Sequence, residues 1–227
     1  MSPAANDRAA SRPDEARLRI TEVFYSLQGE ARTVGWPTVF VRLTGCPLRC
    51  GYCDTTYAFH GGEWESLSDI ERRVAAYTPR FVTVTGGEPL AQPACRELLA
   101  RLASQGYEVS LETSGALAID GIDARVSVVM DLKTPGSGEV DRNRYENIAQ
   151  LKPSDQVKFV ICDRADYEWS RAKVNEYALS ARCEVLFSPA YGQMNPATLA
   201  DWILADRLPV RMQVQLHKIL WGDVPGR

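Results

Sequence analysis

Hydrophobic and polar positions along the chain follow two different periods, and these periods predict strands and helices in turn. Residues 38–43 and 81–85 are runs of β-branched and apolar side chains, which is typical of strands buried on both faces. Residues 18–25 alternate enough to predict an initial strand, and residues 210–216 alternate strictly, which predicts a final one. Further strands are expected at residues 107–112, 126–131, 157–161 and 184–187.

Helical periodicity and capping residues fill the segments between these strands. The sequence from Ser68 to Glu71 has the form of a capping box, which predicts that a helix begins at Ser68. Pro93 suits the first turn of a second helix, and Gly106 suits its C-terminal cap. Residues 166–181 predict a third helix, and Asn195 followed by a proline predicts the start of a fourth. The side chains expected to face the core are Ile70, Val74 and Tyr77, then Leu98, Leu99 and Leu102, then Trp169, Ala172 and Tyr177, and finally Leu199, Trp202 and Ile203.

Repeated strand–helix units predict an α/β fold with a parallel sheet and right-handed crossovers. The number of units favours an incomplete, TIM-like β/α barrel over a closed eight-fold barrel of about 250 residues. We expect one domain over residues 18–227, with its active site at the C-terminal ends of the strands. Residues 1–17 contain no apolar stretch, and their composition predicts a disordered leader rather than a signal peptide.

Charge and hydropathy narrow the classes of function. The formal net charge is -3 at pH 7, which argues against a surface built for nucleic acids. No apolar run has the length that a membrane span requires. We therefore expect a cytoplasmic protein in a reducing compartment, which also suits cysteine thiolates as ligands.

Three of the six cysteines, Cys46, Cys50 and Cys53, lie together directly after the strand at residues 38–43. Three thiolates at this spacing can ligate three irons of a [4Fe–4S] cluster and leave the fourth iron open for chemistry. A disulfide is disfavoured by the odd number. The serious alternative is structural zinc with four ligands, for which His60 is the available fourth. The other three cysteines, Cys95, Cys162 and Cys183, are scattered and are expected to pack in the core.

Other polar and glycine-rich motifs also follow predicted strands. They are Gly86-Gly87-Glu88, the segment from Glu112 to Gly115, the segment from Asp131 to Lys133, and Ser188-Pro189. Because the carboxyl ends of parallel strands meet at one edge of the sheet, we expect these motifs to lie near the cysteine loop. Taken alone, Gly86-Gly87 would more simply be a tight turn from a strand to a helix.

The cysteine spacing, with an aromatic residue before the last cysteine and a later Gly-Gly-Glu-Pro, resembles the radical S-adenosylmethionine superfamily. Further motifs narrow the resemblance to the 7-carboxy-7-deazaguanine synthase family. They are residues 24–30 (FYSLQGE), 40–46 (FVRLTGC), 53–57 (CDTTY), 85–89 (TGGEP), 111–115 (LETSG) and 215–218 (QLHK). The resemblance implies a ring-contracting lyase that converts 6-carboxy-5,6,7,8-tetrahydropterin to 7-carboxy-7-deazaguanine with release of ammonia, on the path to queuosine. The implied cofactors are a [4Fe–4S] cluster, S-adenosylmethionine and Mg²⁺.

The resemblance also implies roles for individual residues. Cys46, Cys50 and Cys53 would ligate the cluster, and Thr55 would ligate Mg²⁺. The residues implied for S-adenosylmethionine are Tyr52, Cys53, Asp54, Gly87, Glu88, Asp131, Lys133, Ser188 and Tyr191. The residues implied for the pterin are Leu27, Gln28, Gly29, Glu30, Arg42, Thr85 and His217, with Arg42 holding the substrate carboxylate. Thr113, Ser114 and Pro189 are further candidates beside these ligands.

Several structural alternatives stay open at the level of the sequence. Arg42 can form an ordinary salt bridge, Thr55 can bond its local backbone, and His217 can be a satisfied structural histidine. The resemblance implies a homodimer and a reductant such as flavodoxin or ferredoxin. The alternative functions are another radical enzyme, such as a glycyl-radical activase, or a zinc module with three cysteines and a histidine that serves protein interactions.

Overall fold

The computed structural model describes residues 15–226 of the chain. The predicted leader falls mostly on residues 1–14, which lie outside the described part. Its predicted end at residue 17 is wrong, because Arg17 already begins a strand. Glu15 and Ala16 are also tied to the domain, since the backbone N–H of Leu67 donates to the carbonyl of Ala16 and that of Ser68 donates to the Glu15 carboxylate.

One open sheet of nine strands organises the molecule, in the order β3-β1-β2-β4-β5-β6-β7-β8-β9. The strands are β1 (Arg17–Leu27), β2 (Pro37–Leu43), β3 (Glu63–Ser66), β4 (Phe81–Gly86), β5 (Glu108–Thr113), β6 (Ser127–Asp131), β7 (Gln156–Ile161), β8 (Glu184–Pro189) and β9 (Arg211–Met212). From β2 to β9 all neighbours are parallel, as predicted. The sheet is not closed, so the prediction of an incomplete barrel is confirmed.

The first three strands in the sheet order depart from the parallel pattern. β1 is antiparallel to both β2 and β3, and β3 was not predicted. The pairing of β1 with β2 shifts by one residue between Ile20 and Glu22, which marks a β-bulge at Thr21. Ile20 therefore points into the core, while Glu22 stands opposite Arg42 on the other face.

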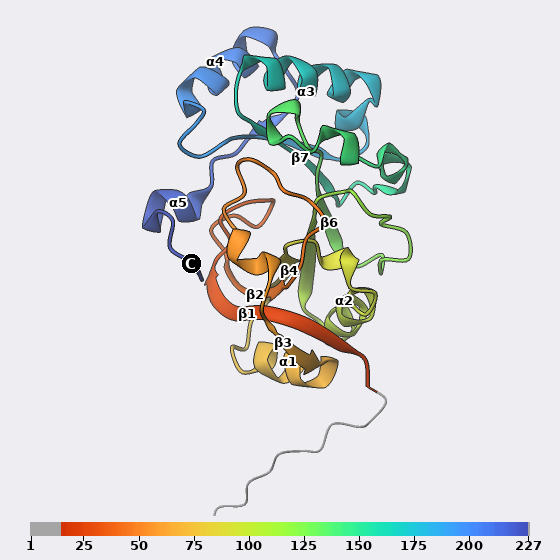
Figure 1. Cartoon of the computed structure of the whole chain (residues 1–227). Coiled ribbons are helices and arrows are strands. Elements are labelled where there is room, and N and C mark those ends of the chain that lie inside the picture. Colours follow the sequence, from red (N-terminus) through yellow and green to blue (C-terminus); the bar gives the residue numbers. More distant parts are fainter. Residues whose placement is uncertain (1–14, 227) are drawn as a thin grey trace, which may run out of the picture.

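Helices cover the sheet and connect its strands (Figure 1). The α-helices are α1 (Leu67–Ala75), α2 (Cys95–Ser104), α3 (Arg164–Glu176), α4 (Pro196–Asp206) and α5 (Leu216–Trp221). Short 3-10 turns are η1 (Thr56–Phe59), η2 (Pro89–Ala91), η3 (Pro135–Ser137), η4 (Val140–Arg142), η5 (Tyr145–Gln150) and η6 (Leu179–Ala181). In Figure 1, α1 lies beside β1 and β3 at one end of the molecule, α3 and α4 lie at the other, and α5 lies at the side near the C-terminus. Among residues 15–226, no helix is long and apolar enough to cross a membrane.

Local sequence explains where the helices begin. Asn195 caps α4 by accepting from the N–H groups of residues 197 and 198, and Pro196 is its first residue, as predicted. The predicted start of α1 at Ser68 is wrong by one residue, and its cap is Ser66, whose hydroxyl accepts from the N–H of Asp69. The capping box at Ser68 was misleading because Ser66, with an aspartate three residues later, offers an equivalent cap earlier in the chain.

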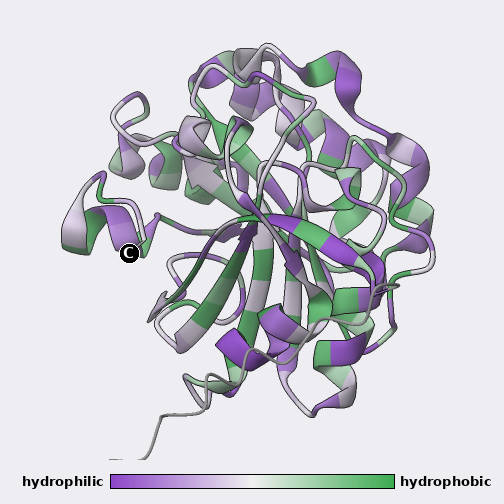
Figure 2. Cartoon of the chain, turned by 60° about the horizontal axis from the view of Figure 1, so that its bottom comes forward, coloured by the Kyte–Doolittle hydropathy of each residue, from purple (hydrophilic) through white to green (hydrophobic). Residues whose placement is uncertain are grey.

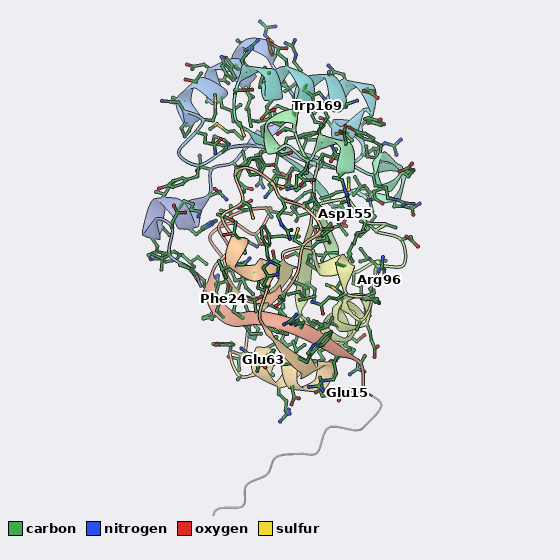
Figure 3. All side chains as sticks on the ribbon, in the orientation of Figure 1. Glu15, Phe24, Glu63, Arg96, Asp155 and Trp169 are labelled. Atoms are coloured by element: carbon green, nitrogen blue, oxygen red, sulfur yellow. The ribbon has the colours of Figure 1, made fainter. Side chains whose placement is uncertain are left out.

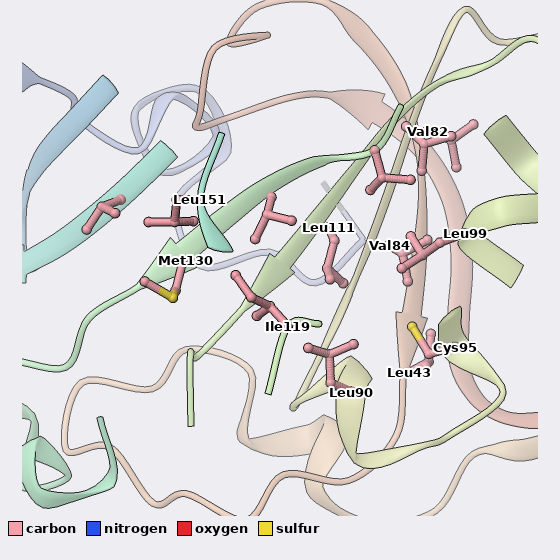
Figure 4. Close-up of a cluster of buried hydrophobic side chains, with 14 of the residues drawn as sticks. Leu43, Val82, Val84, Leu90, Cys95, Leu99, Leu111, Ile119, Met130 and Leu151 are labelled. Carbon is pink, nitrogen blue, oxygen red and sulfur yellow. The ribbon is translucent and has the colours of Figure 1, made fainter. Parts of the chain in front are cut away.

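Apolar side chains on one face of the parallel strands pack against the helices and form the core, while the alternate positions, such as Arg42, Glu112 and Lys158, face the cavity. Leu98, Leu99 and Leu102 of α2 are fully buried, as predicted, and each contributes roughly 1.5–3 kcal/mol by burial. Figure 4 shows Leu99 beside Val84 of β4, and Cys95 nearby among the same apolar residues. In Figure 2 the hydrophobic colour follows the strands, while the surrounding helices and loops carry most of the hydrophilic colour.

Two predicted elements differ from the structure. The helix predicted over residues 166–181 ends at Glu176, because Ala178 adopts a left-handed backbone with φ 49°. Its buried face is formed by Tyr167, Ser170 and Val174, and Ala172 is exposed. Tyr77, predicted on the inner face of the first helix, lies beyond the end of α1 and is also exposed.

The strand predicted over residues 210–216 is reduced to β9, which has two residues. After β9, the side-chain amide of Gln213 accepts from the N–H of Ala31 at 2.7 Å and donates to the Ala31 carbonyl at 2.9 Å. The chain then enters α5 at Leu216, so His217 lies in a helix and not at the end of a strand.

Candidate active site

The C-terminal ends of the parallel strands surround one cavity of about 560 Å³, a volume typical of sites for small ligands. All the residues predicted for the site from the sequence line this cavity except Glu88. They are Leu27, Gln28, Gly29, Glu30, Arg42, Cys46, Cys50, Tyr52, Cys53, Asp54, Thr55, Thr85, Gly87, Asp131, Lys133, Ser188, Tyr191 and His217. The additional candidates Thr113, Ser114 and Pro189 line it as well.

The lining has two sides that come from different parts of the fold. We call the first the cysteine side; it comprises the loop of residues 46–55, Gly86-Gly87 and the segment 131–133. We call the second the β1–α5 side; it comprises residues 27–30 at the end of β1, residues 215–218 at the start of α5, and Glu112, which accepts a hydrogen bond from Gln28. The backbone N–H of Leu216 donates to the carbonyl of Gly29 at 3.0 Å, which holds residues 27–30 and 215–218 together.

Backbone hydrogen bonds fix the cysteine loop. The N–H of Cys53 donates to the carbonyl of Cys50 at 3.1 Å, and the N–H of Gly51 donates to the carbonyl of Ser137 at 2.9 Å. The guanidinium of Arg49 donates to the carbonyl of Cys46 at 2.7 Å. All three cysteines are partly exposed at the cavity, and burial raises the pKa of the Cys50 thiol to about 11. The Cys50 thiol therefore needs a strong cationic partner, such as a metal, to be held as a thiolate.

The arrangement distinguishes a cluster from a zinc site. Within residues 15–226, no three His, Cys, Asp or Glu side chains are grouped closely enough to hold a single metal ion. His60, the required fourth zinc ligand, is exposed and lies outside the cavity lining. A [4Fe–4S] cluster instead spreads three thiolates over three irons. The donor set of Cys46, Cys50 and Cys53 around one cavity therefore fits the cluster better than zinc.

Gly86 and Gly87 allow the end of β4 to approach the start of the cysteine loop. A Cβ atom on Gly87 would lie 2.2 Å from the carbonyl oxygen of Gly45, and one on Gly86 would lie 2.4 Å from that of Leu43. These distances exclude any side chain. The tight turn and the exposure of backbone to the cavity are thus properties of the same pair of glycines.

Glu88 is the one predicted site residue that does not line the cavity. Its carboxylate is fully buried and accepts from the Thr113 hydroxyl at 2.9 Å and from the N–H groups of Ser114 at 2.7 Å and Leu90 at 2.9 Å. Because these donors stabilise a buried carboxylate, Glu88 joins the ends of β4 and β5. Its side chain does not reach the cavity.

Asp131 and Lys133 form an ion pair at the cysteine side, with 3.0 Å between Asp131 Oδ2 and Lys133 Nζ. Burial alone would lower the pKa of Lys133, but the Asp131 carboxylate outweighs it and raises that pKa. Two buried oxygens nearby, Asp131 Oδ1 and the Tyr52 hydroxyl, have no hydrogen-bond partner in the described part of the chain. Such atoms normally bond to something, so they suit a polar ligand in this cavity.

On the β1–α5 side, the Gln28 amide is fully engaged with the protein. Its Nε2 donates to the Thr83 hydroxyl at 3.0 Å and to the Glu112 carboxylate at 3.3 Å, and its Oε1 accepts from the N–H of Glu30. Gln28 therefore orders the wall of the cavity. Its predicted contact with a ligand through the amide would require exchange of these bonds.

Two carboxylates, Glu30 and Glu112, lie together in this wall with different surroundings. Glu30 pairs with Lys158 at 2.7 Å and accepts from Gln215 at 2.8 Å. Burial would raise the pKa of Glu30, but Lys158 outweighs this and lowers it. Glu112 has neutral donors only, with the Thr85 hydroxyl at 2.9 Å, and burial followed by repulsion from Glu30 raises its pKa.

Residues from α5 complete the wall. A Cβ atom on Gly29 would lie 2.0 Å from Nδ1 of His217, so a side chain at this position would displace the His217 ring. The ammonium of Lys218 pairs with Asp54 Oδ2 at 3.2 Å and with Asp223, and the Thr55 hydroxyl donates to Asp54 Oδ1 at 2.8 Å. Thr55 therefore bonds a neighbouring side chain, and this pair of oxygen-bearing groups faces the cavity.

Arg42 forms the salt bridge that was its structural alternative, with 2.7 Å between its Nε and Glu22 Oε1. It also lines the cavity. Four further lining residues, Glu112, Lys158, Gln215 and Lys218, were assigned no role from the sequence, although all but Lys158 belong to motifs quoted above. A signal existed for Lys158, since a lysine within an apolar strand needs a partner, and for Glu112, since it ends a predicted strand.

The chain is similar to several known proteins. A family model described as the radical SAM superfamily matches residues 40–134. The 7-carboxy-7-deazaguanine synthase of Chlorobaculum tepidum is 44% identical over 92% of this chain and 96% of that protein. The same enzyme of Koribacter versatilis is 42% identical over 90% and 97%. The crystal structure of QueE from Escherichia coli is similar in fold, with a TM-score of 0.74 at 22% identity over 88% of this chain and 95% of that one.

Proposed function

The chain belongs to the 7-carboxy-7-deazaguanine synthase family, and from this membership we propose that it is the ring-contracting lyase of deazapurine biosynthesis. The proposed reaction converts 6-carboxy-5,6,7,8-tetrahydropterin to 7-carboxy-7-deazaguanine and releases ammonia. The observation that carries the proposal is that the cysteine side and the β1–α5 side open onto the same cavity. A ligand of the cluster and a pterin can then be held next to each other.

Cys46, Cys50 and Cys53 would hold a [4Fe–4S] cluster, with S-adenosylmethionine bound beside it. When bound, this pair supplies the radical that starts the reaction. The protein would orient the cofactor through the backbone at Gly87 and through the oxygens of Asp131 and Tyr52, which lack partners in the described part of the chain. The three cysteines and these oxygens share one cavity, which supports this assignment.

The β1–α5 side would hold the pterin. The amino and N–H groups of a pterin are donors, and the carboxyls of Glu30 and Glu112 are suitable acceptors in this wall. Arg42 would bind the carboxylate of the substrate, because a guanidinium offers paired donors to such a group. His217 would contact the pterin from α5.

Mg²⁺ would bind at Thr55. The hydroxyl of Thr55 and the carboxylate of Asp54 are oxygen donors at the cavity, and Mg²⁺ typically takes one or two such groups, with water and substrate oxygens completing its shell. Bound metal would share Asp54 with Lys218, which pairs with that carboxylate in the structure. The ion would orient the substrate carboxylate and offset its charge.

The proposal is tested with protein reconstituted with iron and sulfide under anaerobic conditions. With S-adenosylmethionine, Mg²⁺, a reductant and the carboxytetrahydropterin, we expect release of ammonia and formation of 7-carboxy-7-deazaguanine. Protein with a full cluster that binds S-adenosylmethionine but forms no product would contradict the proposal. A glycyl-radical activase would instead cleave S-adenosylmethionine without binding the pterin, and a zinc module would be colourless.

Three further parts of the proposal concern the surroundings of the enzyme. A flavodoxin or ferredoxin would supply electrons, a homodimer would be the functional form, and the reducing cytoplasm would suit the thiolate ligands. Light scattering after size-exclusion chromatography tests the oligomeric state. Turnover with each purified electron carrier tests the reductant.

A further inference from the structure

A charged and aromatic group on β1, β2 and η1 surrounds the guanidinium of Arg42. We propose that Glu22 and Tyr57 are positioning residues that hold Arg42 so that its two terminal nitrogens face the cavity and select pterins with a carboxylate substituent. The inference rests on the proposed function, since it assigns a pterin to this cavity. It concerns the orientation of the Arg42 guanidinium, and neither Glu22 nor Tyr57 was assigned a role from the sequence.

The β-bulge at Thr21 brings Glu22 to Arg42. In the regular register that holds at Ile20 and Leu43, Thr21 would stand opposite Arg42. The bulge inserts one residue, so Glu22 takes that place and shares the face of Arg42. Thr21 is held at the bulge by its hydroxyl, which lies 2.7 Å from the hydroxyl of Thr44.

Arg42 is held through one nitrogen only. Its Nε donates to Glu22 Oε1 at 2.7 Å, and no acceptor within residues 15–226 bonds its terminal nitrogens Nη1 and Nη2. The side chain is 15% exposed, so these donors lie largely out of bulk water. Donors in such a place cost free energy unless they are bonded, and the cavity that Arg42 lines is where an acceptor can bind.

Aromatic rings restrict the plane of the guanidinium. The Arg42 Cζ atom lies 5.7 Å from the centroid of the Phe24 ring and 5.9 Å from that of Tyr57. Phe24 extends from β1, where it is labelled in Figure 3, and Tyr57 comes from η1. These contacts favour a guanidinium that is aimed before a ligand binds.

Tyr57 links this group to the cysteine side. Its hydroxyl donates to Glu22 Oε1 at 2.8 Å, the same oxygen that accepts from Arg42 Nε. The carboxylate therefore fixes both side chains at once. A guanidinium engaged at Nε presents its terminal nitrogens to a ligand, and two such donors match the two oxygens of a carboxylate.

The test measures binding of two stable, unreactive probes, 6-carboxypterin and 6-methylpterin, to the reconstituted enzyme with S-adenosylmethionine and without reductant. The selectivity is the ratio of the two dissociation constants. We expect Glu22→Ala to lower this ratio on the order of 10-fold, through weaker binding of 6-carboxypterin. Tyr57→Phe should lower it about 3-fold, and Glu22→Gln should restore most of the ratio because its amide oxygen still accepts from Nε.

Matched controls separate this inference from a general loss of structure and from the proposed function. Glu65→Ala removes a strand glutamate that pairs with Arg73 outside the cavity, and it should leave the ratio unchanged. If Glu22→Ala keeps the wild-type ratio while Arg42→Ala loses it, the inference is overturned and the role of Arg42 stands. A Glu22→Gln variant as impaired as Glu22→Ala overturns positioning in favour of a charge effect. A wild-type enzyme that does not prefer 6-carboxypterin contradicts the proposed role of Arg42 itself.

Discussion

The two sides of the cavity differ in how their residues are distributed along the chain. The cysteine side is built from short segments at the ends of parallel strands, such as Gly86-Gly87 at the end of β4 and residues 131–133 at the end of β6. The β1–α5 side joins residues 27–30 to residues 215–218, from opposite ends of the domain, through contacts such as that between Gly29 and His217. The first side therefore follows from the topology, whereas the second depends on close packing between remote segments.

The largest expected effect comes from removing a ligand on the cysteine side. Cys53→Ala should abolish turnover and the brown colour of the anaerobically reconstituted protein, because two thiolates hold the cluster poorly. Iron analysis and visible absorption are the measurements. Cys162→Ala is the matched control, since Cys162 does not line the cavity, and it should keep the full iron content. Equal iron in the two variants would contradict the assignment.

Lys158 connects the two sides, because it pairs with Glu30 at 2.7 Å and with Asp131 at 3.6 Å. Lys158→Met should lower the free energy of unfolding by about 3 kcal/mol at pH 7, since it leaves buried carboxylates without their cation. Arg72→Met, which removes an exposed pair with Asp69 in α1, should change it little. Urea unfolding of both variants provides the comparison.

The pH dependence of the same variant adds a second measurement. The pKa of Glu30 is lowered because Lys158 outweighs burial, and that of Asp131 is lowered because Lys133 and Lys158 outweigh burial. Carboxylates with lowered pKa stabilise the fold above their unfolded pKa, and this contribution is lost as pH falls through the folded pKa. In Lys158→Met the folded pKa values rise, so the acid-side loss of stability should begin at higher pH. If the free energy of unfolding depended on pH in the same way in Lys158→Met and in the wild type, the proposed ion pairs of Lys158 with Glu30 and Asp131 would be contradicted.

Two glycine substitutions test whether the sides bind different ligands. Gly29→Ala should displace His217 and lower turnover on the order of 100-fold through pterin binding, with little change in S-adenosylmethionine binding. Gly87→Ala should do the reverse, because it pushes against Gly45 and Cys46. Gly51→Ala, on the cysteine side itself, separates displacement of Gly45 and Cys46 from the mere addition of a methyl group, since its Cβ would have only ordinary protein contacts at 3.9 Å or more. Binding of each ligand is measured separately. If both variants weakened the binding of both ligands equally, the assignment of a different ligand to each side would be contradicted.

The smallest expected effect concerns Glu112. Its pKa is raised by burial and by Glu30, so it opposes folding as pH rises through that pKa. Glu112→Gln should therefore raise the free energy of unfolding by about 1 kcal/mol at pH 7 and leave it nearly unchanged near pH 4. Binding of the pterin should weaken in the same variant. The difference in free energy of unfolding between Glu112→Gln and the wild type should be larger at pH 7 than at pH 4. The opposite order would contradict this account.

The contrast between the two sides also explains how much the sequence could predict. The buried strands and the start of α4 followed from apolar runs and from Asn195-Pro196, which act locally. The lining role of the cysteine loop followed from its place after a strand. The shortness of β9 could not be predicted in this way. The chain leaves the sheet because the Gln213 amide bonds Ala31, and the alternation of residues 210–216 cannot reveal a partner so far away in the sequence. The face of the sheet on which Glu22 lies was not predicted either, because it depends on a β-bulge that interrupts the regular alternation of side chains along the strand.

Gln213 has a further consequence for motion. Its amide bonds the N–H and the carbonyl of Ala31 as a neighbouring strand would, and Arg211 adds a bond to that carbonyl at 2.8 Å. Releasing these side-chain bonds costs about 1 kcal/mol each, well below the several kcal/mol of global unfolding. The contact between residues 211–213 and Ala31 can therefore open locally while the hydrogen bonds between the parallel strands stay intact. Amide hydrogen exchange at Ala31 would report that local opening.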